Sequence, residues 1–413
     1  MQFNTFMMYL NNNQFFKKKE KFVLVFLLLL SFSIRIPVIF IFGDTSLEWE
    51  WEPLVNNLIT HEILSYKKFD DFLLPNLFMP PLYAYYLYLF SFLNLELHNY
   101  INVILFSQAF LASVSVVIFY KINKIFFSQK ISFYSSLIFS FFPINAYACS
   151  QISSISLQTF FLLSFFYFFF KLNKKKDFLT IFIFSFISGL LILLRGEFIL
   201  IFIFSILYLF IFFKMKLKNI FIIILISFIT ISPYLIRNIL IFDEIVITKS
   251  FGFNLWKGNN SNAGVEGSEF MNEKLKEKIN AIYKDKFLTI NTDKIFMDEA
   301  IKNISESPTK YFYSYIKKII SFIFIDINST QTNYYNHLHY LPLLVVGVTS
   351  LIGIALSDKK SSKMNYLILI FLFNILIFSS FFILPRYKLA ILPLQLIFTN
   401  IFINNIKNHF IKS

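Results

Sequence analysis

Long apolar runs, separated by short polar connections, cover most of the chain from about residue 22 to its C-terminal end. Each run has about 17 to 23 residues, the length that an α-helix needs to cross a hydrocarbon core roughly 30 Å thick. The pattern predicts an all-α polytopic membrane protein. The predicted spans cover residues 22–42, 101–120, 131–148, 151–170, 178–195, 197–213, 219–241, 340–357, 365–384 and 388–404.

Two shorter apolar stretches fit this pattern poorly. The stretch at 81–93 is too short for a straight span, and the stretch at 311–327 carries Lys317 and Lys318 in its middle. Because charges inside a span are costly, we expect both stretches to be re-entrant or to lie at the membrane interface. The sequence therefore predicts a helical bundle of about ten to twelve spans.

The lysines gather in short clusters between the apolar runs, and these clusters set the expected orientation. They are Lys17–Lys21, Lys121–Lys130, 171–176, 214–218, 358–363 and the tail with Lys407 and Lys412. Cytoplasmic loops carry an excess of Lys and Arg, so we place all six clusters, and the N-terminus, on the cytoplasmic side of the membrane. The net charge of +14 then reflects topology, and we expect no nucleic-acid partner.

With the lysines inside, residues 43–100 and 242–339 face outward, and the chain has three parts. Residues 1–241 form an N-terminal membrane module that includes a first outer loop at 43–80. Residues 242–339 form a small outer-face domain, in which 272–286 has a helical pattern with Leu275, Ile279 and Ile282 on one side. Residues 340–413 supply the C-terminal spans. The one cysteine, Cys149, excludes an internal disulfide framework.

The first outer loop is unusually acidic. It opens with "GDTSLEWEWE", so that Asp44, Glu48, Glu50 and Glu52 follow directly after an apolar span. A carboxylate at the outer end of a span can act as a general base at the membrane surface. A merely solvated loop has the same composition, so the loop alone leaves both interpretations open.

Few charges lie within or at the ends of the predicted spans. They are Arg35, Arg195, Glu197, Arg237 and Arg386. By the predicted topology all except Arg35 lie toward the outer face, and Arg35 is expected to snorkel outward. Guanidinium groups bind phosphate oxygens bidentately, so acids near several arginines suit a phosphate-bearing lipid substrate. Pairing with a carboxylate or headgroup would explain any single arginine. Only the occurrence of several arginines at one predicted face indicates a phosphate site.

The order of these motifs resembles a known family. The acidic loop, "MPPLYAYYLYLFSFL", "GLLILLRGEF", "SPYLIRN", "GFNLWKGNN" and "PRYKLAILP" follow one another from about Arg35 to Pro393. The order is similar to that of the bacterial GT-C glycosyltransferases related to protein O-mannosyltransferases and to the lipid A aminoarabinose transferase. The resemblance implies a GT-C-type helical bundle that transfers a hexosyl or pentosyl group. It also implies a polyprenyl-phosphate sugar donor and an acceptor at the outer face.

The resemblance also implies roles for individual residues. The acidic residue of the first outer loop matches Asp44, with Glu48 as its rival, because this loop reads D-T-S-L-E-W where D-E-x-x-Y is commoner. The segment "YACSQISSISLQ", where many relatives carry an acid, has none. The remaining signatures match Arg237 and Asn238, Trp256, Asn259 and Asn260, and Arg386 and Tyr387.

A lipid-phosphate sugar already carries its leaving group, so the protein has two tasks. It activates an acceptor hydroxyl or amine, and it stabilises charge on the departing phosphate. We predict an inverting single displacement with Asp44 or Glu48 as base. Arg237, Arg386, Arg195 and Lys257 are the predicted phosphate ligands, and Trp256, Asn259, Asn260 and Tyr387 the predicted sugar or acceptor ligands.

A metal is not expected. Asp44 and Glu48 could lie one helical turn apart and share a divalent cation, but the loop has neither a D-x-D motif nor a histidine beside them. His61, His337 and His339 are expected at the interface. No Gly-rich phosphate loop or dinucleotide fingerprint occurs, which argues against a nucleotide-driven reaction.

Three other classes of membrane protein remain as alternatives. A polyprenyl-linked glycan ligase, polymerase or flippase also presents arginines to lipid phosphates, but a flippase places charge along the centre of its bundle. A transporter is disfavoured because no internal repeat stands out. A non-catalytic scaffold has no need of Asp44 or the arginines. The sequence names neither the sugar nor the acceptor, which is a lipid, a glycan or a protein.

Overall fold

The computed structural model describes residues 20–69, 72–283, 290–358 and 360–412, and nearly all of its regular elements are helices. In these residues the single sheet is an antiparallel hairpin of β1 (Ser65–Phe69) and β2 (Phe72–Pro75). Three features of the sequence lie outside the described residues: the lysines at 17–19, two further acids of the predicted first outer loop (Asp70 and Asp71), and the end of the predicted helix at 284–286.

Six of the described helices are long and apolar enough to cross a membrane. They are α3 (Glu20–Phe42), α6 (Leu97–Phe126), α9 (Ile155–Lys174), α12 (Leu217–Phe242), α17 (His337–Ala355, apolar from Leu338) and α18 (Ser362–Ser379). Two shorter apolar helices, α10 (Phe178–Leu194) and α11 (Phe198–Ile211), stand beside them. Large side chains on their outer faces, such as Phe40 and Leu240, are well exposed, as expected for surfaces that meet lipid.

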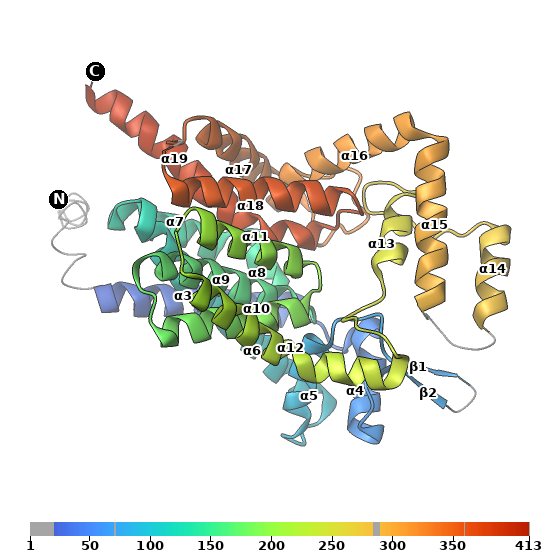
Figure 1. The fold of residues 1–413 in the computed structure, drawn as a ribbon. Coiled ribbons are helices and arrows are strands. Elements are labelled where there is room, and N and C mark those ends of the chain that lie inside the picture. The colour runs from blue at the N-terminus through green and yellow to red at the C-terminus, as the bar shows by residue number, and fades with distance from the viewer. Residues whose placement is uncertain (1–19, 70–71, 284–289, 359, 413) are drawn as a thin grey trace.

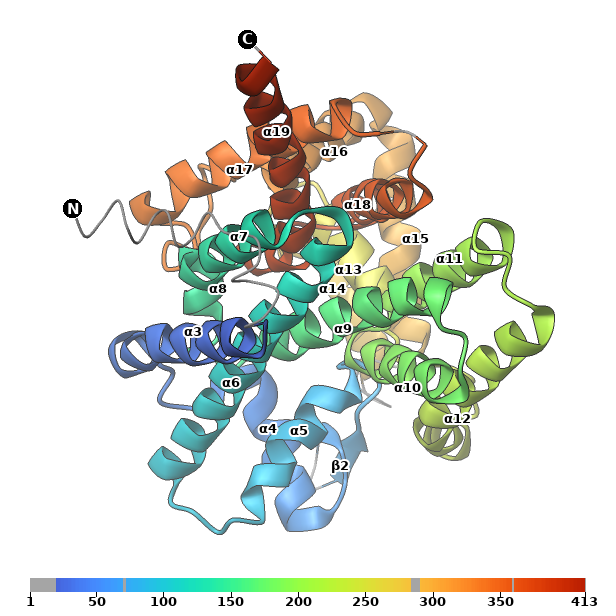
Figure 2. The same cartoon turned by 90° about the vertical axis from the view of Figure 1, so that its left-hand side faces the viewer.

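The helices pack as one bundle around α6 and α9, seen end-on in Figure 2. Helix α6 contacts α3, α7 (Gln129–Phe141) and α9, while α10 lies between α9 and α12. Helix α19 (Leu392–Lys412) packs against α17. Buried polar side chains join the helices, because the Asn400 amide donates to the oxygens of Asn123 at 2.8 Å and Ser135 at 2.9 Å. Such hydrogen bonds hold helices together where no water competes.

The described lysine clusters share one end of this bundle. Lys124 forms a 2.7 Å ion pair with Glu20 at the start of α3. Lys121 lies 5.8 Å from the ring centroid of Tyr167, near the end of α9. Farther along, Lys176 donates to the carbonyl of Phe213, which follows α11. The start of α3 and the end of α19 lie at this end in Figure 1. That this end faces the cytoplasm remains a prediction.

Two of the predicted spans have breaks. The stretch 131–148 is divided between α7 and α8 (Pro143–Ala148), because Pro143 has no backbone N–H and begins a new helix. The stretch 388–404 begins in the 3₁₀ helix η1 (Pro385–Ala390) and continues as α19. The two doubtful apolar stretches are α5 (Pro81–Ser91) and α16 (Pro308–Ile323). Their placement at the interface remains a prediction.

The segment predicted to lie at the outer face, residues 242–339, is helical as well. It comprises α13 (Phe251–Gly258), α14 (Glu273–Tyr283), α15 (Ile290–Glu306) and α16, which lie at the end of the molecule away from the termini in Figure 1. The helix expected at 272–286 is confirmed as α14, with Leu275 and Ile279 buried. These two side chains share a small core with Trp256, Phe296 and Ala300.

Candidate active site

Asp44 lies directly beyond the end of α3, where two segments far apart in sequence meet. Its backbone N–H donates to the carbonyl of Ser150 at 3.0 Å. Its carboxylate Oδ2 accepts a 2.5 Å hydrogen bond from the backbone N–H of Ile152. The Gln151 amide donates to the carbonyl of Phe42 at 2.9 Å and so caps the last turn of α3. The turn after α8 therefore fixes both the backbone and the carboxylate of Asp44.

The environment of Asp44 favours its protonated form. Burial, opposed by the Ile152 hydrogen bond and reinforced by the charge of Glu48, raises the pKa of Asp44 from 3.8 to about 6. Glu48 itself is exposed and begins α4 (Glu48–His61) with a backbone φ of 60°. Residues 43–47 are not helical, so the helical turn that a shared cation would require between the two acids is not formed.

Tyrosines form the wall behind Asp44. The Tyr147 and Tyr334 rings meet edge to face, with centroids 4.9 Å apart. The Tyr83 hydroxyl donates to Gln108 at 2.7 Å. Burial raises the pKa of the Tyr147 phenol, and the charge of Asp44 raises it further. The carboxylate therefore borders a desolvated aromatic surface, in which electrostatic interactions are stronger than in water.

Arg386 lies near Tyr334 as well. Its Nη2 atom is 4.0 Å from Oε1 of Glu50, a loose ion pair whose two side chains are about one-third exposed, at 30% and 34%. Burial raises the pKa of Tyr334, the positive charge of Arg386 lowers it, and the charge of Asp44 raises it. Asp44 and Arg386 thus act on one tyrosine, with the acidic helix α4 beside them.

Arg195 extends this group. It lies in the turn between α10 and α11, where its Nε donates to Glu197 at 2.7 Å and its Nη1 to Gln158 at 2.9 Å. Its Cζ atom lies 4.8 Å from the centroid of the Tyr387 ring, the residue after Arg386. The acid of the first outer loop and two of the predicted arginines are therefore brought together at one end of the bundle.

Arg237 has a different position. Its Nη1 donates to the carbonyl of Asn76 at 2.8 Å and to Asn238 Oδ1 at 2.6 Å, and its Nη2 reaches the carbonyl of Leu64 at 3.3 Å. These carbonyls flank the β1–β2 hairpin at the end of the first outer loop. The guanidinium therefore joins α12 to that loop.

The "GFNLWKGNN" segment is mostly buried within the protein. Trp256 is 1% exposed in the small outer core. The amide of Asn259 donates to the carbonyls of Leu255 and Ser380, each at 2.8 Å, and the amide of Asn260 donates to the carbonyl of Ser268 at 2.5 Å. A Cβ on Gly258 would lie 2.0 Å from the carbonyl oxygen of Phe381. Gly258 thus allows the backbone of this segment to approach another part of the chain closely.

Buried Lys318 completes this arrangement, because its Nζ donates to the carbonyl of Gly258 at 2.7 Å. The charged middle of α16 is therefore explained by a contact at the end of α13. Arg35 is also buried, at 0% exposure, and donates to the backbone and side chain of Ser31. The expectation that Arg35 snorkels outward is wrong, since its side chain points into the bundle.

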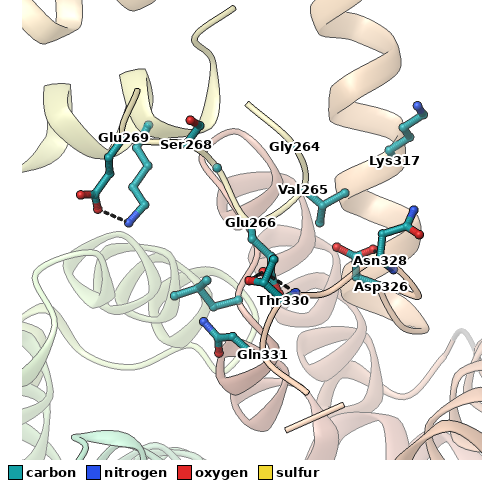
Figure 3. A pocket seen from close by; sticks show the side chains of 13 residues that line it. Gly264, Val265, Glu266, Ser268, Glu269, Lys317, Asp326, Asn328, Thr330 and Gln331 are labelled. Carbon is teal, nitrogen blue, oxygen red and sulfur yellow. Dashed lines mark hydrogen bonds and ion pairs between the residues drawn. The ribbon is translucent and has the colours of Figure 1, made fainter. Parts of the chain in front are cut away.

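A polar cavity of about 540 Å³ lies beside the segment that follows Asn260. Figure 3 shows its lining, which comes from residues 264–269, from the loop 326–331 after α16, and from α16 itself. Lys257 lines it as well, and its Nζ pairs with Glu269 at 2.6 Å. The predicted phosphate ligand Lys257 is therefore at the cavity and already bound to a carboxylate.

Within the described residues, no group of three or more His, Cys, Asp and Glu side chains is arranged to hold a metal ion. His339 is buried at the start of α17, where its Nδ1 hydrogen-bonds to the carbonyl of Tyr334. His61 is exposed in the last turn of α4. Neither of these two histidines belongs to the segment that carries Asp44.

Sequence reasoning missed the partners of the candidate acid. Ile152 contributes through its backbone N–H, which leaves no sequence signal. Tyr334 borders the acid with its side chain. Gln158, which like Gln151 is a long polar residue near the start of the span 151–170, accepts a hydrogen bond from Arg195. The nearby "SQISS" stretch, which has no acid, provides backbone donors and acceptors for one instead.

Comparison with known proteins agrees with this architecture. The family model described as dolichyl-phosphate-mannose-protein mannosyltransferase matches residues 79–236. No curated protein matches the sequence. The apo crystal structure of the Archaeoglobus fulgidus oligosaccharyltransferase is similar at a TM-score of 0.57 and 12% identity, covering 96% of this chain and 51% of that one.

Two further crystal structures of that enzyme are also similar. One is tethered to an acceptor peptide containing the NVT sequon, with a TM-score of 0.54, 13% identity, and 96% and 50% of the two chains covered. The other is a complex with Zn and sulfate, with a TM-score of 0.53, 13% identity, and 94% and 50% covered. The chain thus spans about half the length of this enzyme. The expected all-α fold class is confirmed, and the chain is an integral membrane protein whose fold is similar to that of the Archaeoglobus fulgidus oligosaccharyltransferase.

Proposed function

We propose that this protein transfers a sugar from a polyprenyl-phosphate donor to an envelope acceptor at the outer face of a bacterial cell membrane. The observation that supports this most directly is the carboxylate of Asp44, whose pKa is raised to about 6 and which lies in the same group of residues as Arg386 and Arg195. The fold and the match to the mannosyltransferase family model support the same reaction class. The lysine-rich end of the bundle, with the N-terminus, is proposed to face the cytoplasm.

Asp44 is proposed as the general base. A base works best when its pKa lies near the working pH, because it is then ionised and still basic enough to take a proton. A pKa of about 6 meets this condition better than the usual value of 3.8. The single hydrogen bond from Ile152 leaves the other carboxylate oxygen for an acceptor hydroxyl or amine. Glu48, exposed and set back by the turn at 44–47, is the second choice.

Arg386, with Arg195 behind it, is proposed to hold the donor phosphate. The 4.0 Å separation from Glu50 leaves the Arg386 guanidinium able to exchange a weak partner for a phosphate. Tyr387 lies against Arg195 and would keep the two cations on one side of the leaving group. Attack by the acceptor from the Asp44 side would then invert the sugar carbon in a single displacement.

Arg237 is proposed to position the first outer loop instead of binding phosphate. All of its donors with assigned partners go to protein oxygens on or beside that loop and to Asn238. Trp256, Asn259 and Asn260 are likewise proposed to support the outer-face part. Their indole and amides are buried against the chain itself.

The proposal is tested in cells by the mass of envelope glycans. Removing the protein should remove one sugar residue, of hexose or pentose mass, from a lipid, glycan or protein of the envelope. Wild-type protein should restore that mass, and Asp44→Asn should not. Glu52→Gln is the matched control, because Glu52 is an exposed acid of the same α4 segment. Restoration by Asp44→Asn, or an unchanged envelope after removal, would contradict the proposal.

A further inference from the structure

The 540 Å³ cavity has a size typical of ligand sites, and three separate segments line it. One wall is the run from Gly264 to Glu269. The facing wall is the loop at 326–331, and Leu384 closes a third side. The walls are fastened together, because Glu266 accepts hydrogen bonds from the Thr330 backbone at 3.0 Å and from its hydroxyl at 2.6 Å (Figure 3). The positions of these two cavity walls are therefore fixed by hydrogen bonds between them.

The charges around the cavity disfavour a phosphate. Three carboxylates line it, from Glu266, Glu269 and Asp326, against the two lysines Lys257 and Lys317. Lys257 is committed to Glu269, and Lys317 stands at the edge of the group in Figure 3. An anion would therefore meet an excess of negative charge.

The remaining polar lining groups include both hydrogen-bond donors and acceptors. They are the hydroxyls of Ser268 and Thr330 and the amides of Asn328 and Gln331, beside the apolar Val265 and Leu384. A sugar ring presents the matching surface, with hydroxyls that both donate and accept around its edge and apolar C–H groups on its face. Uncharged hydroxyl-rich ligands suit this lining best.

Two short turns of the chain join residues of the cavity wall to residues of the candidate active site. The carbonyl of Gln331, in the cavity wall, accepts a 3.1 Å hydrogen bond from the N–H of Tyr334, whose ring packs against Tyr147 beside Asp44. The carbonyl of Leu384, in the third wall, accepts from the N–H of Tyr387 at 2.9 Å. Two walls of the cavity therefore belong to the same turns as Tyr334 and Tyr387 of the candidate active site.

We infer that this cavity binds an uncharged sugar unit of the acceptor, so that the acceptor is a glycan or a glycan-bearing molecule. The inference rests on the proposed function and adds a substrate class to it. The donor phosphate is left to Arg386 and Arg195, and the acceptor glycan extends from Asp44 past the loop 331–334 into the cavity. The donor phosphate thus binds on the positively charged side of the site, and the acceptor glycan binds on the side with the excess of carboxylates.

Gly264 allows a direct test. It lines the cavity, and a Cβ at this position meets no atom within 4 Å. Gly264→Trp should therefore fill the cavity without straining the fold, while Gly264→Ala should leave it open. Binding is measured by saturation-transfer NMR on the purified full-length protein in nanodiscs. The probes are neutral methyl glycosides and disaccharides, with inorganic phosphate as the anionic probe.

We expect at least one neutral sugar to bind wild type and Gly264→Ala saturably, with a Kd raised about tenfold or more by Gly264→Trp. Gln331→Leu, which keeps the size of the side chain and removes its amide, should weaken the same sugar. Asp44→Asn should bind it normally, so the result does not depend on catalysis. Failure of every neutral sugar to bind, or binding that Gly264→Trp leaves unchanged, would overturn the inference. Phosphate that competes with the sugar would also overturn it. None of these outcomes would alter the Asp44 test of the transferase proposal.

Discussion

Asp44 and Ile152 are 108 residues apart in sequence, yet the carboxylate of one accepts a 2.5 Å hydrogen bond from the backbone N–H of the other. The contact joins the end of α3 to the turn before α9, and the N–H of Asp44 joins the same turn through Ser150. Because the donor is a backbone group, its position depends on the packing of several helices. The orientation of the candidate base is thus a property of the whole N-terminal module.

This contact predicts the pH dependence of activity. A base with a pKa of about 6 loses activity as the pH falls through 6, so kcat/KM should rise with pH and level off above it. The stability contribution has the opposite sign. Since the pKa of Asp44 is raised in the folded state, its contribution is full below 3.8 and is lost as the pH rises through about 6.

A substitution at Ile152 tests the cause of that pKa. The Ile152 hydrogen bond lowers the pKa of Asp44 against the effect of burial. Ile152→Pro removes the N–H and should therefore shift the acidic limb of the pH–rate profile above 6. Ile152→Ala retains the N–H and is the control for lost side-chain packing. Equal profiles for the two variants would show that this hydrogen bond does not set the pKa.

Arg386 predicts a second kinetic effect. Arg386→Gln removes a positive charge from the proposed leaving-group site, and the loss of one such stabilising group typically lowers kcat by about 10² to 10³-fold. Arg386→Lys should recover part of the rate, because the charge is kept and bidentate binding is lost. Initial rates against donor concentration measure both. Lys302→Gln, at an exposed position on α15, is the control. Rates unchanged by Arg386→Gln would remove Arg386 from the phosphate site.

Arg237 predicts a change in stability. Arg237→Ala leaves the carbonyls of Asn76 and Leu64 without their guanidinium donor, at a cost of about 1–3 kcal/mol. The thermal midpoint in detergent should fall, while the KM for the donor in the folded fraction stays near that of wild type. A donor KM that rises strongly at an unchanged midpoint would return Arg237 to the phosphate site, where the sequence motif had placed it.

The sequence predicted the broad fold because its signals are physical and local. Apolar runs of span length predicted the helices, and the lysine clusters shared one end as expected. The helix at 272–286 followed from the spacing of Leu275 and Ile279. The break at Pro143 was equally local, and a continuous apolar run concealed it.

The candidate site was only partly predictable. The sequence shows charges at the ends of predicted spans at Asp44, Arg195 and Arg386. Charged side chains are energetically costly there, which indicates a functional role. The division of labour among the motif residues was not visible. Arg237, Asn259 and Lys318 bind backbone carbonyls, and a sequence does not distinguish a carbonyl partner from a substrate. The cavity wall at 264–269 carries no motif at all, because its lining becomes a site only when α16 and its loop fold against it.

The most direct test of the central claim is the rate of sugar transfer from a polyprenyl-phosphate donor by purified wild type, Asp44→Asn and Glu48→Gln in the same nanodiscs. The donor is the polyprenyl-phosphate sugar contained in the membrane-lipid fraction that the wild-type protein consumes. Asp44→Asn should lose about 10² to 10⁴-fold in rate, the usual contribution of a general base, while still binding donor. Glu48→Gln should remain within a few-fold of wild type. Full activity of Asp44→Asn would contradict the account, and loss confined to Glu48→Gln would transfer the role of base to Glu48.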